Sequence, residues 1–194
     1  MNGDHFTDCG LPGIRDIPYG IHMCHFYDRR EDLAAMLVPY FVAGLSRNER
    51  CIWVSAEPLP AADAKAELRK AGLDVAAAER NGSLFVVDFD QWYPDSQTLK
   101  GEDVVKLWLA EEKRALAQGY AGLRITGNVT FLSPETWHLF MEYEETVNDA
   151  LRGHRIVTLC TYRSGDCGAS ELLDVARCHQ CTLHRPDEGW QILS

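Results

Sequence analysis

The sequence predicts an α/β fold, a three-layer sandwich in which helices cover both faces of a mostly parallel central sheet. Short apolar, β-branched segments alternate with longer segments of helical period, which is typical of βα units. Two further segments, Cys181–Leu183 and Trp190–Leu193, flank a turn-forming sequence and predict a closing C-terminal β-hairpin. Five segments are β-branched and nearly continuous in apolar character, as expected of strands buried on both faces: Ile21–Tyr27, Cys51–Ser55, Leu84–Phe89, Leu123–Thr126 and Arg155–Tyr162.

Helices are predicted between these strands. The first has Asp28 as its N-cap with Glu31 three residues later, the spacing of a capping box, and Pro39 should bend it. The others are predicted over 60–71, over 102–118, from Ser133-Pro134 to about Gly153, and over 169–177. Residues 1–18 show no clear period and predict a loosely held N-terminal arm before a single domain over 19–194.

Composition and charge exclude several classes of protein. A chain of 194 residues with 46 % hydrophobic residues can build one globular core. With 19 Lys and Arg against 29 Asp and Glu, the net charge is −10, and the cations are scattered. Nucleic acid and anionic membrane surfaces are therefore unsuitable partners. No apolar run could span a bilayer and no signal segment begins the sequence, so a cytoplasmic location is expected.

A ligand site is expected at the carboxyl ends of the parallel strands, where open α/β sheets bind their ligands. Aromatic and polar residues gather there, and this mixture suits a small-molecule pocket with apolar walls and a few polar anchors. The alternative is that the aromatic rings only close the end of the sheet. The residues expected at the site are His25, Tyr27, Ser55, Glu57, Asp90, Trp92, Tyr93, Thr161 and Tyr162.

Glu144 joins this list for a different reason. It falls within the apolar stripe of the fourth predicted helix, where a carboxylate must be paired, hydrogen-bonded or raised in pKa. Two interpretations follow: a structural salt bridge to an arginine such as Arg124, or a polar anchor in the pocket.

Nucleotide hydrolysis is not expected. The stretch from His25 to Asp32 that follows the first strand holds no glycine, and the phosphate-binding pattern G-x-x-x-x-G-K-[ST] is missing. No nucleophile elbow and no H-E-x-x-H motif occur either. A non-enzymatic protein without a cofactor is therefore expected. An enzyme that uses Asp88 or Asp90 with His25 is an alternative that no motif supports.

The seven cysteines are odd in number, which disfavours a disulfide scaffold. Cys178, Cys181 and His184 have a spacing that is compatible with Zn or Fe, so a metal- or redox-responsive protein is the alternative function. On the first strand, alternation places His22 and Cys24 on one face and His25 on the other.

Several motifs together resemble the MEDS family, the methanogen/methylotroph DcmR sensory domain, over about residues 19–194. They are Ile21–Tyr27, Leu37–Phe41 with Gly44-Leu45, Cys51–Ser55, Gly119–Arg124, Tyr143-Glu144 with Asn148, and Leu159–Tyr162.

The resemblance implies a RecA/KaiC-like core that has lost its phosphate loop. It also implies a role in bacterial or archaeal signal transduction, through the sensing of small molecules such as hydrocarbon derivatives. Longer members carry a helix-turn-helix or kinase module that this chain does not have. The expected function is therefore a stand-alone sensor that acts through a signalling protein partner, with homo-oligomerisation as a further option.

Overall fold

The computed structural model describes residues 5–93, 101–128, 137–186 and 189–194. Its centre is a seven-stranded sheet in the order β5-β4-β6-β7-β3-β8-β9. Neighbouring strands are parallel except for β8 and β9, which form an antiparallel hairpin, so the predicted sheet is confirmed. The strands are β3 (Ile21–Tyr27), β4 (Arg50–Ser55), β5 (Leu84–Asp88), β6 (Leu123–Asn128), β7 (Ile156–Arg163), β8 (Cys181–His184) and β9 (Gln191–Leu193).

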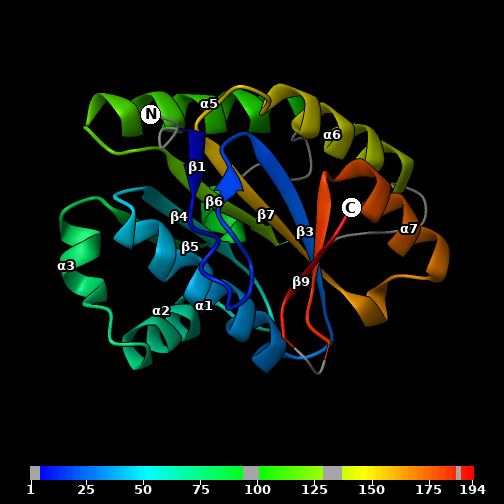
Figure 1. Ribbon diagram of the computed structural model, residues 1–194, viewed down its shortest axis with the longest axis horizontal. Helices are drawn as coiled ribbons and strands as arrows, with labels where there is room; N and C mark the ends of the chain where they lie inside the picture. Colours follow the sequence, from blue (N-terminus) through cyan, green and yellow to red (C-terminus); the bar gives the residue numbers. More distant parts are fainter. Residues whose placement is uncertain (1–4, 94–100, 129–136, 187–188) are drawn as a thin grey trace.

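Two layers of helices enclose the sheet, as the sequence predicts (Figure 1). One face packs against α1 (Arg30–Ser46), α2 (Ala61–Lys70) and α3 (Val75–Arg80). The other packs against α5 (Gly101–Ala117), α6 (Trp137–Ala150) and α7 (Ala169–Cys178). Short turns of helix, α4 (Phe89–Trp92) and η3 (Ser164–Asp166), follow β5 and β7. Within the described residues, no helix is both long enough and apolar enough to cross a membrane.

Two of the helices differ from the prediction, α1 in its first residue and α3 in not having been predicted. Helix α1 starts after Arg29, not Asp28, because the Asp32 carboxylate accepts from the Arg29 backbone N–H and guanidinium. Helix α3 was not expected, since six residues are too few to show a period, although Asp74 caps it by accepting from the N–H of Ala77. The predicted helix start at Ser133-Pro134 lies outside the described residues.

The segment from residue 5 to residue 18 is part of the core, so its prediction as a loosely held arm is wrong. The strands β1 (Phe6–Thr7) and β2 (Ile17–Pro18) pair antiparallel, and the side chains of Cys9 and Leu11 are buried. The Arg124 guanidinium donates to the backbone carbonyls of Asp8 and Cys9 and so fixes the segment to β6. Sequence periodicity gives no signal here because the two strands are only two residues long and Arg124 holds the segment through main-chain oxygens.

Gly44 is required where α1 crosses β6. A Cβ atom at this position would lie 2.6 Å from the Arg124 side chain and 2.9 Å from the Cys51 sulfur. Both neighbours are buried, so Gly44→Ala should lower the free energy of unfolding by about 1–3 kcal/mol through overpacking. Gly165→Ala is the matched control, because a Cβ there meets nothing within 4 Å. Urea denaturation of both variants tests this, and equal stabilities would contradict it.

Candidate functional site

The most unusual feature of the molecule is a group of polar side chains beneath α6 and α7. It consists of His22, Glu144, Cys160 and His179, and it is called the buried cluster below. All four residues are buried, with His22 and Glu144 fully excluded from solvent. No other group of three or more residues of metal-ligating type occurs in the part of the chain that the structure describes.

The fold brings the cluster together from four separate elements. Strands β3 and β7 are parallel neighbours, with His22 opposite Thr158 and Cys24 opposite Cys160. His22 and Cys160 therefore lie diagonally on the same face of the sheet. Glu144 comes from the buried side of α6, and His179 follows the last residue of α7. Residues far apart in the sequence thus meet because two helices cover one pair of strands.

The polar atoms of the cluster approach one another closely. The His22 Nε2 atom lies 3.3 Å from the Cys160 Sγ atom and 3.4 Å from the Glu144 Oε2 atom. The His179 Nε2 atom lies 3.6 Å from the same Oε2 atom. The ligating atoms of all four residues lie within 4.8 Å of one another.

Two hydrogen bonds outside the cluster fix its orientation. The Tyr162 hydroxyl donates to Glu144 Oε1 at 2.7 Å. The His179 Nδ1 atom lies 2.8 Å from the Val175 carbonyl oxygen, which can only accept, so Nδ1 carries the proton and the Nε2 lone pair is turned toward Glu144. Burial raises the pKa of Glu144 to about 8, opposed by the Tyr162 hydrogen bond, and burial lowers the pKa of His179 to about 4.

Several atoms of the cluster have no hydrogen-bond partner. Among the described residues, these include Glu144 Oε2 and His179 Nε2, although both are fully buried. The ion-pair contacts of Glu144 within the same part of the chain are with His22 and His179, and none is with Lys or Arg. Such a set of acceptor atoms can hold a proton or a metal cation, and uncompensated burial is costly without one.

Arg124 does not pair with Glu144, so the salt-bridge interpretation of Glu144 is wrong. The Arg124 guanidinium binds the Glu49 carboxylate and the Tyr40 carbonyl oxygen instead. These residues lie on the α1 face of the sheet, whereas Glu144 lies on the α6 face, and the sheet separates the two.

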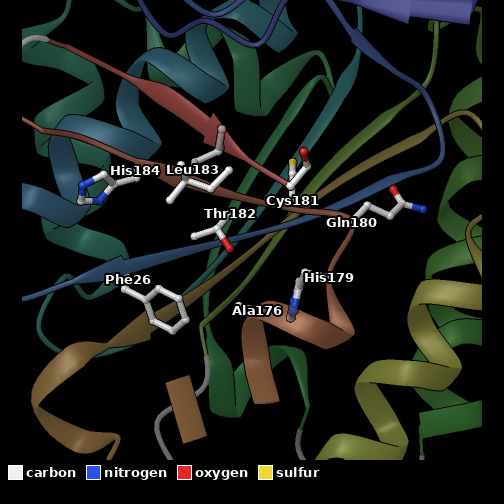
Figure 2. A pocket seen from close by; sticks show the side chains of 10 residues that line it. Phe26, Ala176, His179, Gln180, Cys181, Thr182, Leu183 and His184 are labelled. Carbon is white, nitrogen blue, oxygen red and sulfur yellow. The ribbon is translucent and has the colours of Figure 1, made fainter. Parts of the chain in front are cut away.

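A pocket of about 340 Å³ adjoins the buried cluster along β8. In Figure 2, Thr182 points to the same side of β8 as Phe26 and His179, while Cys181 and Leu183 point to the other side. His179 belongs both to the pocket wall and to the cluster. The pocket is lined by Phe26, Ala176, His179, Gln180, Cys181, Thr182, Leu183, His184, Leu193 and Ser194.

Most of the predicted ligand residues do not converge on one site. His25 lies on the α1 face with its Nδ1 atom 2.9 Å from the Leu183 carbonyl oxygen, and Tyr27 is buried on that same face. The Ser55 hydroxyl donates to the Val87 carbonyl oxygen, and the Thr161 hydroxyl donates to that of Gly127. These side chains have structural partners within the fold.

The predicted residues that follow β4 and β5 are also separate from the cluster. Glu57 and Asp90 are exposed and Trp92 is half-buried. The Tyr93 hydroxyl accepts from the Trp108 indole N–H in the core beneath α5. Glu144 and Tyr162 are the two predicted residues that the structure does bring together.

The predicted metal set of Cys178, Cys181 and His184 is not assembled. The Cys178 sulfur contacts the Met141 sulfur of α6, whereas Cys181 packs into the core on the α1 face. His184 is exposed at the end of β8. Side chains alternate between the two faces along β8, and Cys178 belongs to α7 instead. The three side chains therefore point in different directions, and their short spacing in the sequence does not indicate a shared metal site.

Sequence reasoning missed His22, Cys160 and His179 as members of one site. Strand alternation correctly separates His22 from His25, and Cys160 lies at an inward position of the fifth predicted strand. The missing information was that β3 and β7 are neighbours and that α7 ends over them. A polar residue within an apolar stripe, as at Glu144, was the signal that identified the site in part.

Comparisons with known proteins agree with this fold. No curated protein matches the chain with significant similarity. Among solved structures, a KaiC-like protein from the hyperthermophilic archaeon Pyrococcus horikoshii OT3 is similar at a TM-score of 0.62 and 12 % identity. The match covers 96 % of this chain and 85 % of that one, and it shows a KaiC-like fold. Residues 21–180 match the family described as the methanogen/methylotroph, DcmR sensory domain, and the chain therefore belongs to the MEDS family.

Proposed function

We propose that this chain is a non-catalytic sensory module that binds a small molecule in the β8 pocket. The observation that carries the proposal is the double role of His179, which lines the pocket and also belongs to the buried cluster. The family is described as a sensory domain, which supports a role in sensing. A ligand in the pocket would contact a side chain whose other neighbours are buried.

The composition of the pocket suits a small, mainly apolar ligand with few polar groups. Phe26, Ala176 and Leu183 provide apolar walls, His179 contributes its ring, and the exposed His184 supplies nitrogen atoms. The Thr182 hydroxyl is within 3.2 Å of the Cys24 sulfur, and the Gln180 side-chain oxygen accepts from the His22 backbone N–H. A short hydrocarbon derivative with one hydrogen-bonding group fits this inventory.

The pocket is connected to α6 through aromatic contacts. The ring centroids of Phe26 and Tyr162 are 5.9 Å apart, and those of His179 and Tyr162 are 5.8 Å apart. Tyr162 in turn donates to Glu144 of α6. A ligand that favours one arrangement of these rings over another would shift α6, and a protein partner would detect that change.

The junction of β3 and α1 supports a non-catalytic role. In a nucleotide-hydrolysing relative of this fold, a glycine-rich loop at this position cradles phosphates with its backbone N–H groups. Here Asp28 and Arg29 lie between the strand and the helix, and Glu31 and Asp32 are in the first helical turn. The Asp32 carboxylate accepts from the Arg29 N–H, so this anion already occupies the helix N-terminus.

Thermal unfolding with a panel of short-chain alcohols, carboxylic acids and haloalkanes, together with Mg-ATP, tests the proposal. One class of hydrocarbon derivative should stabilise the protein, by about 2.7 kcal/mol when its concentration is 100 times the Kd. Ala176→Phe should abolish this shift because the ring fills the pocket. Ala62→Phe is the matched control, since Ala62 is an exposed alanine of α2 on the opposite layer, and it should keep the shift.

Three outcomes would contradict the proposal. One is that no compound of the panel raises the melting temperature. Another is a shift that persists in Ala176→Phe, which would place the ligand elsewhere. The third is magnesium-dependent hydrolysis of ATP by the purified chain.

A further inference from the structure

We propose that the buried cluster is a binding site for one divalent transition-metal ion, and that its ligands favour zinc. The site would exist whether or not the β8 pocket binds a small molecule, so the inference goes beyond the sensory function. The ligating atoms are His22 Nε2, His179 Nε2, Cys160 Sγ and Glu144 Oε2.

The four donor atoms match the chemistry of zinc. Two imidazole nitrogens, a thiolate and a carboxylate oxygen are all common ligands of Zn²⁺, which prefers four of them in a tetrahedron. The thiolate and the carboxylate together carry two negative charges, which offset the charge of the ion. This matters because no Lys or Arg in the described part of the chain pairs with Glu144, so a bound divalent cation would leave the interior neutral.

The spacing of the donors is also suitable. Zinc–nitrogen and zinc–oxygen bonds of about 2.0–2.1 Å and zinc–sulfur bonds of about 2.3 Å place tetrahedral ligands about 3.3–3.6 Å apart. The contacts of His22 Nε2 with Cys160 Sγ and Glu144 Oε2 are 3.3 and 3.4 Å, and that of His179 Nε2 with Glu144 Oε2 is 3.6 Å. Small rotations of side chains would therefore complete the coordination.

Two of the four donors, His179 and Glu144, are held by groups of the kind that support a metal site, whereas the Nδ1 atom of His22 has no hydrogen-bond partner among the described residues. Metal-binding histidines usually donate their second ring N–H to a backbone carbonyl or a carboxylate, which orients the ring. His179 has this arrangement, with Nδ1 2.8 Å from the Val175 oxygen. The Tyr162 hydroxyl holds Glu144 Oε1, which leaves Oε2 directed at the other donors.

A metal ion would satisfy the cluster more completely than a proton. A protonated Glu144 carboxyl has one O–H to donate, whereas both His22 Nε2 and His179 Nε2 face its Oε2 atom. The Cys160 sulfur would remain outside that single bond. One ion would engage all of these atoms together, including the buried Glu144 Oε2 and His179 Nε2 that otherwise have no partner.

The β8 pocket lies next to the cluster. His179 lines the pocket and is 6 % exposed, while its Nε2 atom is buried and faces the cluster. The His179 ring therefore separates the pocket from the donor atoms.

The test loads the purified full chain with Zn²⁺ and, separately, with Co²⁺, and then removes free metal. About one equivalent of zinc per chain should remain by elemental analysis. The Co²⁺ form should show the visible bands of tetrahedral cobalt and a thiolate-to-cobalt charge-transfer band. Cys160→Ala should remove the charge-transfer band, and His179→Ala should weaken binding by more than the 10–100-fold that loss of an outer-shell group costs.

Cys24→Ala is the matched control. Cys24 is a buried cysteine directly opposite Cys160 on the same face, but it is not a member of the cluster. This variant should keep both the metal and the charge-transfer band. Tyr162→Phe preserves the ring and should weaken zinc binding by about 10–100-fold, which provides a second variant if Cys160→Ala does not fold.

Three results would overturn the proposed metal site. A folded wild-type chain that retains less than about a tenth of an equivalent of either metal would overturn the proposal. So would metal binding that Cys160→Ala and His179→Ala leave unchanged, since the ion would then be elsewhere, or a charge-transfer band that depends on Cys24.

Discussion

Replacing Arg124 with methionine is expected to lower the free energy of unfolding by about 3–5 kcal/mol, because it leaves the Glu49 carboxylate buried without its cation. Both side chains of this ion pair are fully excluded from solvent. The guanidinium also donates to the Tyr40 and Asp8 carbonyl oxygens. Its loss should therefore loosen residues 5–18 as well, which hydrogen exchange of that segment would detect alongside urea denaturation.

Two controls distinguish the charge from the packing. Arg152→Met removes an arginine that is 67 % exposed and should change stability by less than about 0.5 kcal/mol. The double variant with Arg124→Met and Glu49→Gln removes both charges and should recover part of the lost stability, since Tyr19 can still donate to the amide oxygen. A double variant that is no more stable than Arg124→Met would show that the cost does not come from the unpaired carboxylate.

Stability of the metal-free chain should fall as the pH rises toward 8, and Glu144→Gln should abolish that fall. Burial raises the folded pKa of Glu144 to about 8 from an ordinary value of 4.5. The folded chain thus holds a proton that the unfolded chain has released, so the stabilisation is complete below about 4.5 and is lost as pH rises through 8. The wild-type chain should lose about 1–2 kcal/mol relative to Glu144→Gln between pH 6.5 and 8, because the slope is about 1.4 kcal/mol per pH unit well below the folded pKa and half of that at the pKa.

The two histidines of the cluster act in the opposite direction. Burial lowers the pKa of His179 to about 4 and also lowers that of His22, so their contribution to stability rises with pH and fades only above the ordinary value of 6.5; because it is common to wild type and Glu144→Gln, the difference between the two isolates Glu144. Burial raises the pKa values of the Cys160 thiol and the Tyr162 hydroxyl well above their ordinary values, which keeps both protonated.

Urea denaturation with a chelator, from pH 6.5 to 8, measures the difference between wild type and Glu144→Gln. Glu145→Gln is the control, because Glu145 is next to Glu144 in the sequence but its side chain is exposed. If the free energy of unfolding had the same slope against pH in wild type and in Glu144→Gln, Glu144 would be ionised in the folded state even without metal.

Most of the fold was predictable because it depends on local patterns. The strand Ile21–Tyr27 has the predicted bounds, and the other parallel strands differ from their predictions by a few residues at their ends. Continuous apolar segments and helical periods can be recognised in the sequence without knowing the tertiary contacts. The N-terminal segment was mispredicted because Arg124 holds it through backbone carbonyls, which the amino-acid pattern does not encode.

The candidate site was predictable only in part. Glu144 and Tyr162 were identified, the first because a carboxylate within an apolar stripe needs a partner. The proximity of Cys178, Cys181 and His184 along the chain suggested a metal site that the fold separates. His22, Cys160 and His179 were not grouped, since their encounter depends on which strands are neighbours.

By itself, the amino-acid sequence determined the α/β class, the parallel strands, the missing phosphate-binding pattern and the presence of a carboxylate in an apolar face. Hydrophobic periodicity and residue type are sufficient for these because they act over one element at a time. Only the tertiary structure decided that β3 lies beside β7 and that α6 and α7 cover them. That arrangement converts four distant polar residues into one cluster, because donor atoms a few ångströms apart interact whatever their separation along the chain.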